Sequence, residues 1–210
     1  MINDILSMES DFSNNEYYGT NVWTEEKFRI LSGKNPILLS APHCVNQIRG
    51  DDVREAEKYT GGIVRYICNI ADCYGIFQMF THADPNTDIE NSYKNAIINM
   101  VDLYDIKLLI DIHASHFKDD CDLDIVTNRR ETLCDHNDLI DRLMALGKKY
   151  DLKIDENNFP NPEKNREIIK VTSLVCGIPA IRIVINSNKL NDNSDKQFEK
   201  IVNLIEEFVK

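Results

Sequence analysis

Two short apolar runs that each end in a histidine constrain this chain more than any other feature. Residues 36–42 (PILLSAP) lead directly into His43, and residues 107–112 (KLLIDI) lead directly into His113. Short runs rich in Leu and Ile are typical of strands that are buried on both faces of a parallel sheet. In open α/β sheets, ligands and catalytic groups gather just beyond the carboxyl ends of the strands. The sequence therefore predicts that two imidazoles lie at the functional edge of such a sheet.

Strand-like and helix-like segments alternate along the rest of the chain. Besides the two runs, apolar or alternating patterns predict strands at 27–31, 75–80, 122–126 and 179–185. Helical spacing and capping residues predict helices at 51–73, 88–104, 135–150, 164–176 and 194–209. Alternation of this kind predicts an α/β fold, in which helices cover both faces of a mainly parallel sheet.

Composition divides the chain into a short polar segment and one globular domain. Residues 1–25 are rich in Asn, Ser and Glu, and we expect a polar N-terminal arm there, with room for one short helix. Residues 26–210 contain no internal repeat and no low-complexity linker, which indicates a single α/β domain of a catalytic type. A length of 210 residues is sufficient for a substantial buried core.

Charge and cysteine usage argue against several classes of protein. The chain has 24 Lys and Arg against 35 Asp and Glu, a net charge of −11, which disfavours nucleic acid and anionic membranes as partners. Six scattered cysteines and an opening segment without a basic start or an apolar core favour a reduced, cytoplasmic location. No apolar run approaches the roughly 18 residues that span a bilayer. We therefore expect a small-molecule substrate, and the sequence leaves the oligomeric state open.

The strand-end histidines and a nearby acidic segment fit the ligand set of a catalytic zinc ion. Such ions take three protein ligands from His and carboxylate residues and leave one position open. The acidic segment after the first run supplies Glu55 and Glu57 as contenders for the third ligand, and we prefer Glu57 because its helical neighbours can turn toward the loop. Asp111, two residues before His113, is a candidate to orient that imidazole. The competing interpretation is that both histidines are hydrogen-bonded structural residues.

Three segments of the chain resemble the N-formylglutamate amidohydrolase-like family, which belongs to the zinc carboxypeptidase-like group. These segments are Ile37–His43, Ala56–Gly62 and Leu109–His113, and the similarity extends from about residue 28 to residue 190. The resemblance implies a three-layer α/β/α, phosphorylase/hydrolase-like fold with a mixed sheet and one zinc ion. It also implies that the metal ligands are His43, Glu57 and His113, and that the segment 91–94, which contains Tyr93, borders the pocket.

One position departs from the pattern of this family. Relatives often carry a glutamate, the general base, in a late strand that reads like Gln-Ile-Glu-Ile-Asn, whereas residues 182–186 of this chain read RIVIN. Val184 therefore stands where the base is expected, and a valine cannot accept a proton. Two functions remain open: a zinc-dependent hydrolase that cleaves the amide bond of a small N-acyl amino acid or γ-glutamyl-type substrate, and a non-catalytic zinc- or ligand-binding protein on the same fold.

A hydrolase without a base at Val184 needs another carboxylate for proton transfer. The candidates near the predicted site are Glu55, Asp111 and Asp124. The candidates for substrate binding are Arg54, Tyr93 and Arg182. Arginine suits this role because its guanidinium can hold a carboxylate through two hydrogen bonds. Arg182 stands out because a charge inside an otherwise apolar strand needs a partner.

Overall fold

A seven-stranded mixed sheet lies at the centre of the molecule, which the computed structural model describes over residues 1–20, 26–87, 91–117, 121–158, 167–190 and 195–210. In spatial order the strands are β1 (Phe28–Leu31), β5 (Cys73–Gln78), β2 (Asn35–Ala41), β7 (Leu108–Ser115), β10 (Ala180–Asn186), β8 (Leu123–Val126) and β9 (Ile154–Glu156). The central strands β5, β2, β7 and β10 are parallel, whereas β1 and β8 run antiparallel to β5 and β10. The prediction of a mainly parallel mixed sheet is confirmed.

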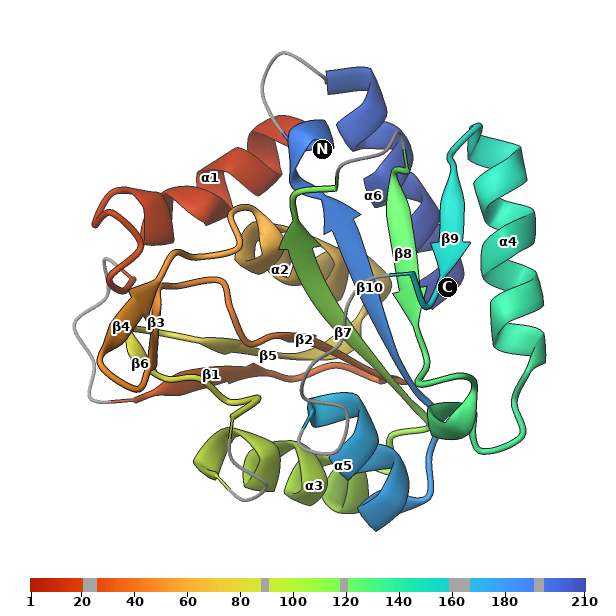
Figure 1. Cartoon of the computed structure of the whole chain (residues 1–210), viewed down its shortest axis with the longest axis horizontal. Coiled ribbons are helices and arrows are strands. Elements are labelled where there is room, and N and C mark those ends of the chain that lie inside the picture. Colours follow the sequence, from red (N-terminus) through yellow and green to blue (C-terminus); the bar gives the residue numbers. More distant parts are fainter. Residues whose placement is uncertain (21–25, 88–90, 118–120, 159–166, 191–194) are drawn as a thin grey trace.

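Helices cover both faces of this sheet, so the fold has the three α/β/α layers that the resemblance implied (Figure 1). One face carries α1 (Ile2–Ser13), α2 (Thr60–Ala71), α4 (Asp138–Tyr150) and α6 (Asp195–Val209). The other face carries α3 (Ser92–Tyr104) and α5 (Ile168–Cys176). Successive strand residues alternate between two apolar cores: Leu39 and Ile110 pack under α2, whereas Leu38 and Leu109 pack under α3.

The helix predicted from residue 51 begins later, at Thr60, so the predicted start is wrong. A small second sheet takes up the preceding residues: β3 (Gln47–Arg49) pairs with β4 (Asp52–Arg54), and β6 (His82–Ala83) pairs with β3. The reason is the turn at Gly50, whose φ of +62° is readily adopted by glycine and reverses the chain into a hairpin. This hairpin, β3–β4, brings a set of charged side chains to the edge of the main sheet.

The N-terminal segment is less loose than its composition suggests. Helix α1 occupies Ile2–Ser13, and its Ile5 and Phe12 are fully buried in the core beside α2. The two helices approach closely because Gly62 has no side chain: a Cβ there would lie 2.8 Å from the carbonyl oxygen of Ile5. The face of α1 that packs against α2 has only a few apolar residues. Polar residues therefore dominate the composition of the segment.

The remaining predicted elements are present with small shifts of their ends. Helices α3, α4 and α5 begin at Ser92, Asp138 and Ile168, each a few residues later than predicted. The expected helix cap Ser194 and part of the predicted loop 156–163 lie outside the described residues. Two 3-10 turns, Glu131–Leu133 and Ser187–Lys189, complete the described elements. Among the described helices, none is both long enough and apolar enough to cross a bilayer.

Candidate metal centre

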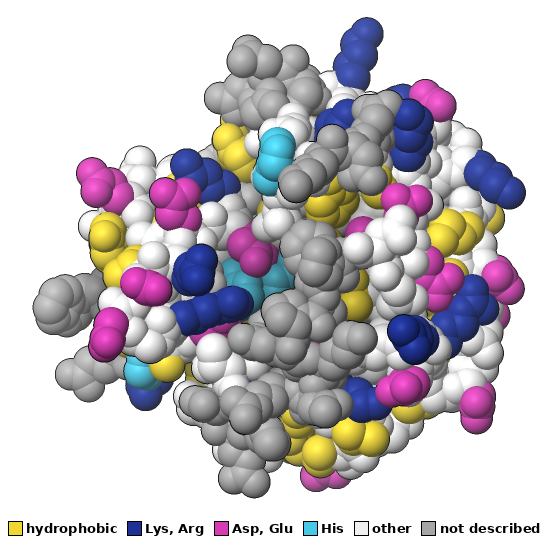
Figure 2. Space-filling model, in the orientation of Figure 1, with side chains coloured by type: hydrophobic (Ala, Val, Ile, Leu, Met, Phe, Trp, Pro, Cys, Tyr) yellow, Lys and Arg dark blue, Asp and Glu magenta, His cyan; other side chains and the backbone are white. Residues whose placement is uncertain are grey.

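The candidate centre forms where strands β2 and β7 end at the same edge of the sheet. These two strands are parallel neighbours, with Ser40 paired to Asp111. His43 follows β2 by two residues, and His113 lies near the end of β7. Glu57 reaches the same place from the loop between β4 and α2. Figure 2 shows one side of the molecule, with histidine and acidic side chains near its centre, beside a group of Lys and Arg side chains.

The side chains of His43, Glu57 and His113 converge as a possible ligand set. One nitrogen or oxygen atom from each of the three lies within 4.8 Å of the other two. Nδ1 of His43 lies 2.8 Å from Oε1 of Glu57, and Nδ1 of His113 lies 2.9 Å from Oε2 of the same carboxylate. Two imidazole nitrogens and one carboxylate oxygen form a donor set that suits a catalytic zinc ion with an open position. The residues present therefore fit the metal that the family resemblance implies.

A buried aspartate holds the second nitrogen of each imidazole. Nε2 of His43 lies 2.8 Å from Oδ1 of Asp84, and Nε2 of His113 lies 2.9 Å from Oδ2 of Asp111. Both carboxylates are at most 1% exposed. An imidazole that donates its Nε2 proton to a carboxylate keeps Nδ1 available as a ligand, and its ring orientation is fixed. Both Nδ1 atoms thus point toward Glu57, as a shared metal ion requires.

Asp111 has the orienting position that the sequence analysis suggested, whereas Asp84 was missed. Asp84 directly follows the short strand β6, in the segment that comes after strand β5, and β5 is also a parallel neighbour of β2. Residues just beyond β5 therefore reach the same edge of the sheet as His43. The segment Asp84-Pro85-Asn86 after a predicted strand was the available signal. The backbone N–H of Asn86 donates to Oδ1 of Asp84, 2.8 Å away, and so fixes the carboxylate.

The charges in the cluster shift the pKa values of its members strongly. Burial by itself lowers the pKa of His43, but the carboxylates of Glu57 and Asp84 outweigh burial and raise that pKa to about 10. The same balance, with Glu57 and Asp111 as the anions, raises the pKa of His113. Burial favours a raised pKa for Glu57, yet the two imidazoles hold it well below its usual range. Without a metal ion, protons on the imidazoles therefore supply the positive charge that these carboxylates need.

Backbone contacts fix Glu57 in this position. Its N–H donates to the carbonyl oxygen of His43 over 2.8 Å, and its Oε2 accepts from the backbone N–H of Ala114 over 2.9 Å. Just beyond it, Tyr59 has a φ of +69°, an uncommon conformation for this residue type, where the chain turns into α2. The buried carboxylate of Glu9 on α1 accepts from the N–H groups of Tyr59 and Gly62, at 2.6 and 2.9 Å. Helix α1 thus supplies the cap for α2, a role that the sequence did not reveal.

Two predicted substrate-binding residues lie in the packed interior instead of a cavity. Nη1 of Arg182 lies 2.7 Å from Oε1 of Glu167, and its Nε lies 3.4 Å from Oδ2 of Asp111. The partner that a charge in an apolar strand requires is therefore inside the protein. The hydroxyl of Tyr93 donates to the carbonyl oxygen of Ile76 over 3.0 Å and is buried. Neither side chain lines the cavity beside Glu57. Both instead make contacts inside the protein that support the edge of the sheet.

The three candidate bases are spread over different places. Asp111 is already engaged by His113 and Arg182. Asp124 is buried on β8, directly opposite Val184 of the neighbouring strand β10. Glu55 is exposed and lines the cavity that opens beside Glu57.

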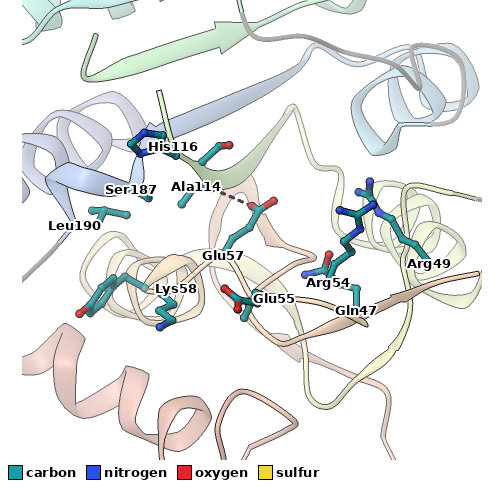
Figure 3. Close-up of a pocket in the computed structure, with 13 residues that line it drawn as sticks. Gln47, Arg49, Arg54, Glu55, Glu57, Lys58, Ala114, His116, Ser187 and Leu190 are labelled. Carbon is teal, nitrogen blue, oxygen red and sulfur yellow. Dashed lines mark hydrogen bonds between the residues drawn. The ribbon is translucent and has the colours of Figure 1, made fainter. Parts of the chain in front are cut away.

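That cavity has a volume of about 520 Å³. The β3–β4 hairpin, the loop 55–59, the end of β7 and the turn Ser187–Lys189 contribute its walls. The predicted substrate-binding residue Arg54 lines it, together with Arg49, Glu55 and Glu57 (Figure 3). It is large enough for a small molecule to approach the candidate metal ligands.

Comparison with solved structures finds proteins of similar fold, whereas no protein-family model and no curated protein matches the sequence. A gene product of Agrobacterium tumefaciens has 13% identity and a TM-score of 0.61, over 88% of this chain and 93% of that one. A bacteriophage poly-gamma-glutamate hydrolase has 9% identity and a TM-score of 0.51, over 89% and 90%. The N-formylglutamate amidohydrolase of Ralstonia eutropha JMP134 has 10% identity and a TM-score of 0.53, over 87% and 98%. The fold of this chain is therefore similar to that of an N-formylglutamate amidohydrolase, as its sequence segments suggested.

Proposed function

We propose that this protein is a cytoplasmic zinc-dependent hydrolase that cleaves the amide bond of a small N-acyl amino acid or a γ-glutamyl-type substrate. The observation that carries the proposal is the convergence of His43, Glu57 and His113 within 4.8 Å, with both Nδ1 atoms turned toward the carboxylate. The fold supports it, because it is shared with solved structures of an N-formylglutamate amidohydrolase and a poly-gamma-glutamate hydrolase.

A zinc ion held by these three residues would supply Lewis-acid chemistry, polarising the amide carbonyl and lowering the pKa of water. The chain itself supplies the remaining tasks. Asp84 and Asp111 keep the two imidazoles in the tautomer and orientation that binding requires. Arg54 in the cavity provides a cation for a substrate carboxylate, and Glu55 is the candidate base that shares this cavity.

Val184 favours a second candidate function, a non-catalytic zinc- or ligand-binding protein. It is 1% exposed and lies opposite His113 in the pairing of β10 with β7. The position next to the metal site where relatives often carry the general base is thus occupied by a side chain that cannot transfer a proton. In its zinc-binding form, this candidate holds the metal in the same way as the first and differs only in turnover.

One experiment tests both candidates on protein purified without an affinity tag. Zinc content is measured by elemental analysis, and hydrolysis is followed on N-formyl, N-acetyl and γ-glutamyl amino acids. A hydrolase binds one zinc ion and loses turnover to a chelator and to His43→Ala, whereas the exposed residue His136 can be changed to Ala without effect. Zinc binding without turnover across the panel would favour the binding protein. A protein that takes up no zinc on titration would refute the hydrolase and the zinc-binding protein.

A further inference from the structure

The β3–β4 hairpin places two arginines on one face, toward the cavity. Gln47 pairs with Arg54 and Arg49 pairs with Asp52, so the side chains of Arg49 and Arg54 are diagonal neighbours on the same face of the hairpin. Figure 3 shows both guanidinium groups extending toward each other at the side of the cavity. The opposite face of the hairpin is different, because it exposes the apolar pair Ile48 and Val53.

These two guanidinium groups have N–H donors that bind no other described residue. Within the described ranges, Arg54 has no ion-pair or hydrogen-bond partner, and Arg49 uses only its Nε, which binds Oδ2 of Asp84. Two neighbouring guanidinium groups repel each other unless an anion lies between them, and their planar N–H groups match a carboxylate. In a chain with a net charge of −11, the cavity wall thus carries two cationic side chains beside Glu55 and Glu57, which line the same cavity.

Arg49 is also connected to the candidate metal centre. Oδ2 of Asp84 accepts from Arg49, while Oδ1 of the same buried carboxylate lies 2.8 Å from Nε2 of His43. Arg49 is partly exposed, with a side-chain exposure of 35%, and it lines the cavity while its Nε binds the buried carboxylate of Asp84. A single carboxylate therefore joins a cavity arginine to a candidate metal ligand.

We propose that Arg49 and Arg54 form a subsite for a carboxylate group of the substrate, and that Arg49 couples its occupancy to the metal centre through Asp84. This proposal rests on the proposed function for the position of the metal. An anion on the Nη groups partly neutralises Arg49, which leaves more of the charge of Asp84 to the N–H of His43. The Nδ1 atom of His43 then becomes a better donor. Carboxylate and zinc consequently strengthen each other's binding by the same factor, because such coupling is reciprocal.

Calorimetric titration of glutarate, a dicarboxylate without a scissile bond, tests the subsite on metal-free and on zinc-loaded protein. Saturating glutarate should lower the zinc Kd of the unchanged protein about 5-fold or more. Arg54→Gln should weaken glutarate binding about 10-fold and leave the zinc Kd measured without glutarate unchanged, because Arg54 does not contact Asp84. Arg49→Lys should weaken glutarate binding about 10-fold and should abolish the effect of glutarate on the zinc Kd, because the contact that joins the subsite to Asp84 is removed. Arg129→Gln removes an exposed arginine that does not line this cavity, and should change neither.

Two results would overturn the proposal: unchanged glutarate affinity of Arg54→Gln, or a zinc Kd of Arg49→Lys that glutarate still lowers about 5-fold. Thermal unfolding of both variants shows that a loss of binding is not a loss of fold. If the unchanged protein bound no zinc, the proposed function and the coupling would fail together. The metal-free glutarate titration would then still decide whether the arginine pair holds a carboxylate.

Discussion

Val184 lies directly opposite His113 in the parallel pairing of β10 with β7, and the two side chains project from the same face of the sheet. Asp124 of β8 is the next residue in this row, on the far side of Val184. Because neighbouring strands lie about 4.8 Å apart, Asp124 begins roughly 10 Å from the strand position of His113. Val184, the residue next to His113 in this row, therefore has no proton-transfer group.

Restoring a carboxylate at this position is expected to raise hydrolysis. We expect Val184→Glu to increase kcat/KM by about 100-fold or more relative to Val184→Gln, because a positioned general base contributes about 10²–10⁴ in rate. Val184→Gln is the matched control, since it carries the same cost of placing a polar group in a buried position. Equal rates for the two variants would show that proton transfer occurs elsewhere, with Glu55 as the next residue to test.

The buried aspartates behind the imidazoles are expected to determine metal affinity. We expect Asp84→Asn and Asp111→Asn each to weaken zinc binding by about 10- to 100-fold, because the loss of the carboxylate leaves the imidazole less basic and less firmly oriented. The exposed Asp141 on α4 is a suitable control for the loss of one negative charge. Competition with a chromophoric chelator measures the Kd. An effect no larger than that of Asp141→Asn would contradict the orienting role.

Zinc binding is expected to strengthen as the pH rises. The pKa of His43 in the metal-free protein is raised to about 10, so at neutral pH a metal ion must displace a proton from this imidazole. For one displaced proton the apparent affinity rises by about tenfold per pH unit below that pKa. Zinc Kd values between pH 6 and pH 9 check this, and calorimetry in two buffers of different ionisation enthalpy counts the released protons. An affinity independent of pH would argue against His43 as a ligand.

Glu9 is expected to make stability depend on pH near neutrality. Burial raises its pKa from 4.5 to about 7, against the opposing effect of the N–H groups of Tyr59 and Gly62. The folded protein therefore holds this proton more tightly than the unfolded chain, so the stabilisation present below pH 4.5 is lost as the pH rises through about 7. A shift of this size corresponds to about 3 kcal/mol.

Urea unfolding of the unchanged protein and of Glu9→Gln measures this contribution. The free energy of unfolding of the unchanged protein, relative to Glu9→Gln, should fall by up to about 3 kcal/mol between pH 4.5 and a pH above 7. Glu199→Gln on the exposed side of α6 should show no such trend relative to the unchanged protein. A constant difference between the unchanged protein and Glu9→Gln would show that Glu9 does not titrate in this range.

The chain alone was sufficient to find the three residues that converge. Each histidine stands at the end of an apolar run, and such runs become buried parallel strands whose ends share one edge. The residues behind them were harder to find, because the contact of His43 with Asp84 spans 41 positions and that of Arg49 with Asp84 spans 35. The hydrophobic periodicity of one segment does not indicate which distant residue its side chains contact. Arg182 shows the same limit, since its need for a partner was predictable while Glu167 and Asp111 as the partners were not.

Local sequence patterns determined the order of strands and helices, the layered α/β architecture and the histidines at the strand ends, because hydrophobic periodicity specifies which residues of a segment become buried. The tertiary structure decided which segments meet. It paired β8 antiparallel to β10, packed α1 onto α2, folded residues 47–54 into a hairpin and set Val184 beside His113. The physical reason is that these arrangements depend on the packing and pairing of segments far apart in the chain. The free energy of such contacts cannot be inferred from the sequence of one segment alone.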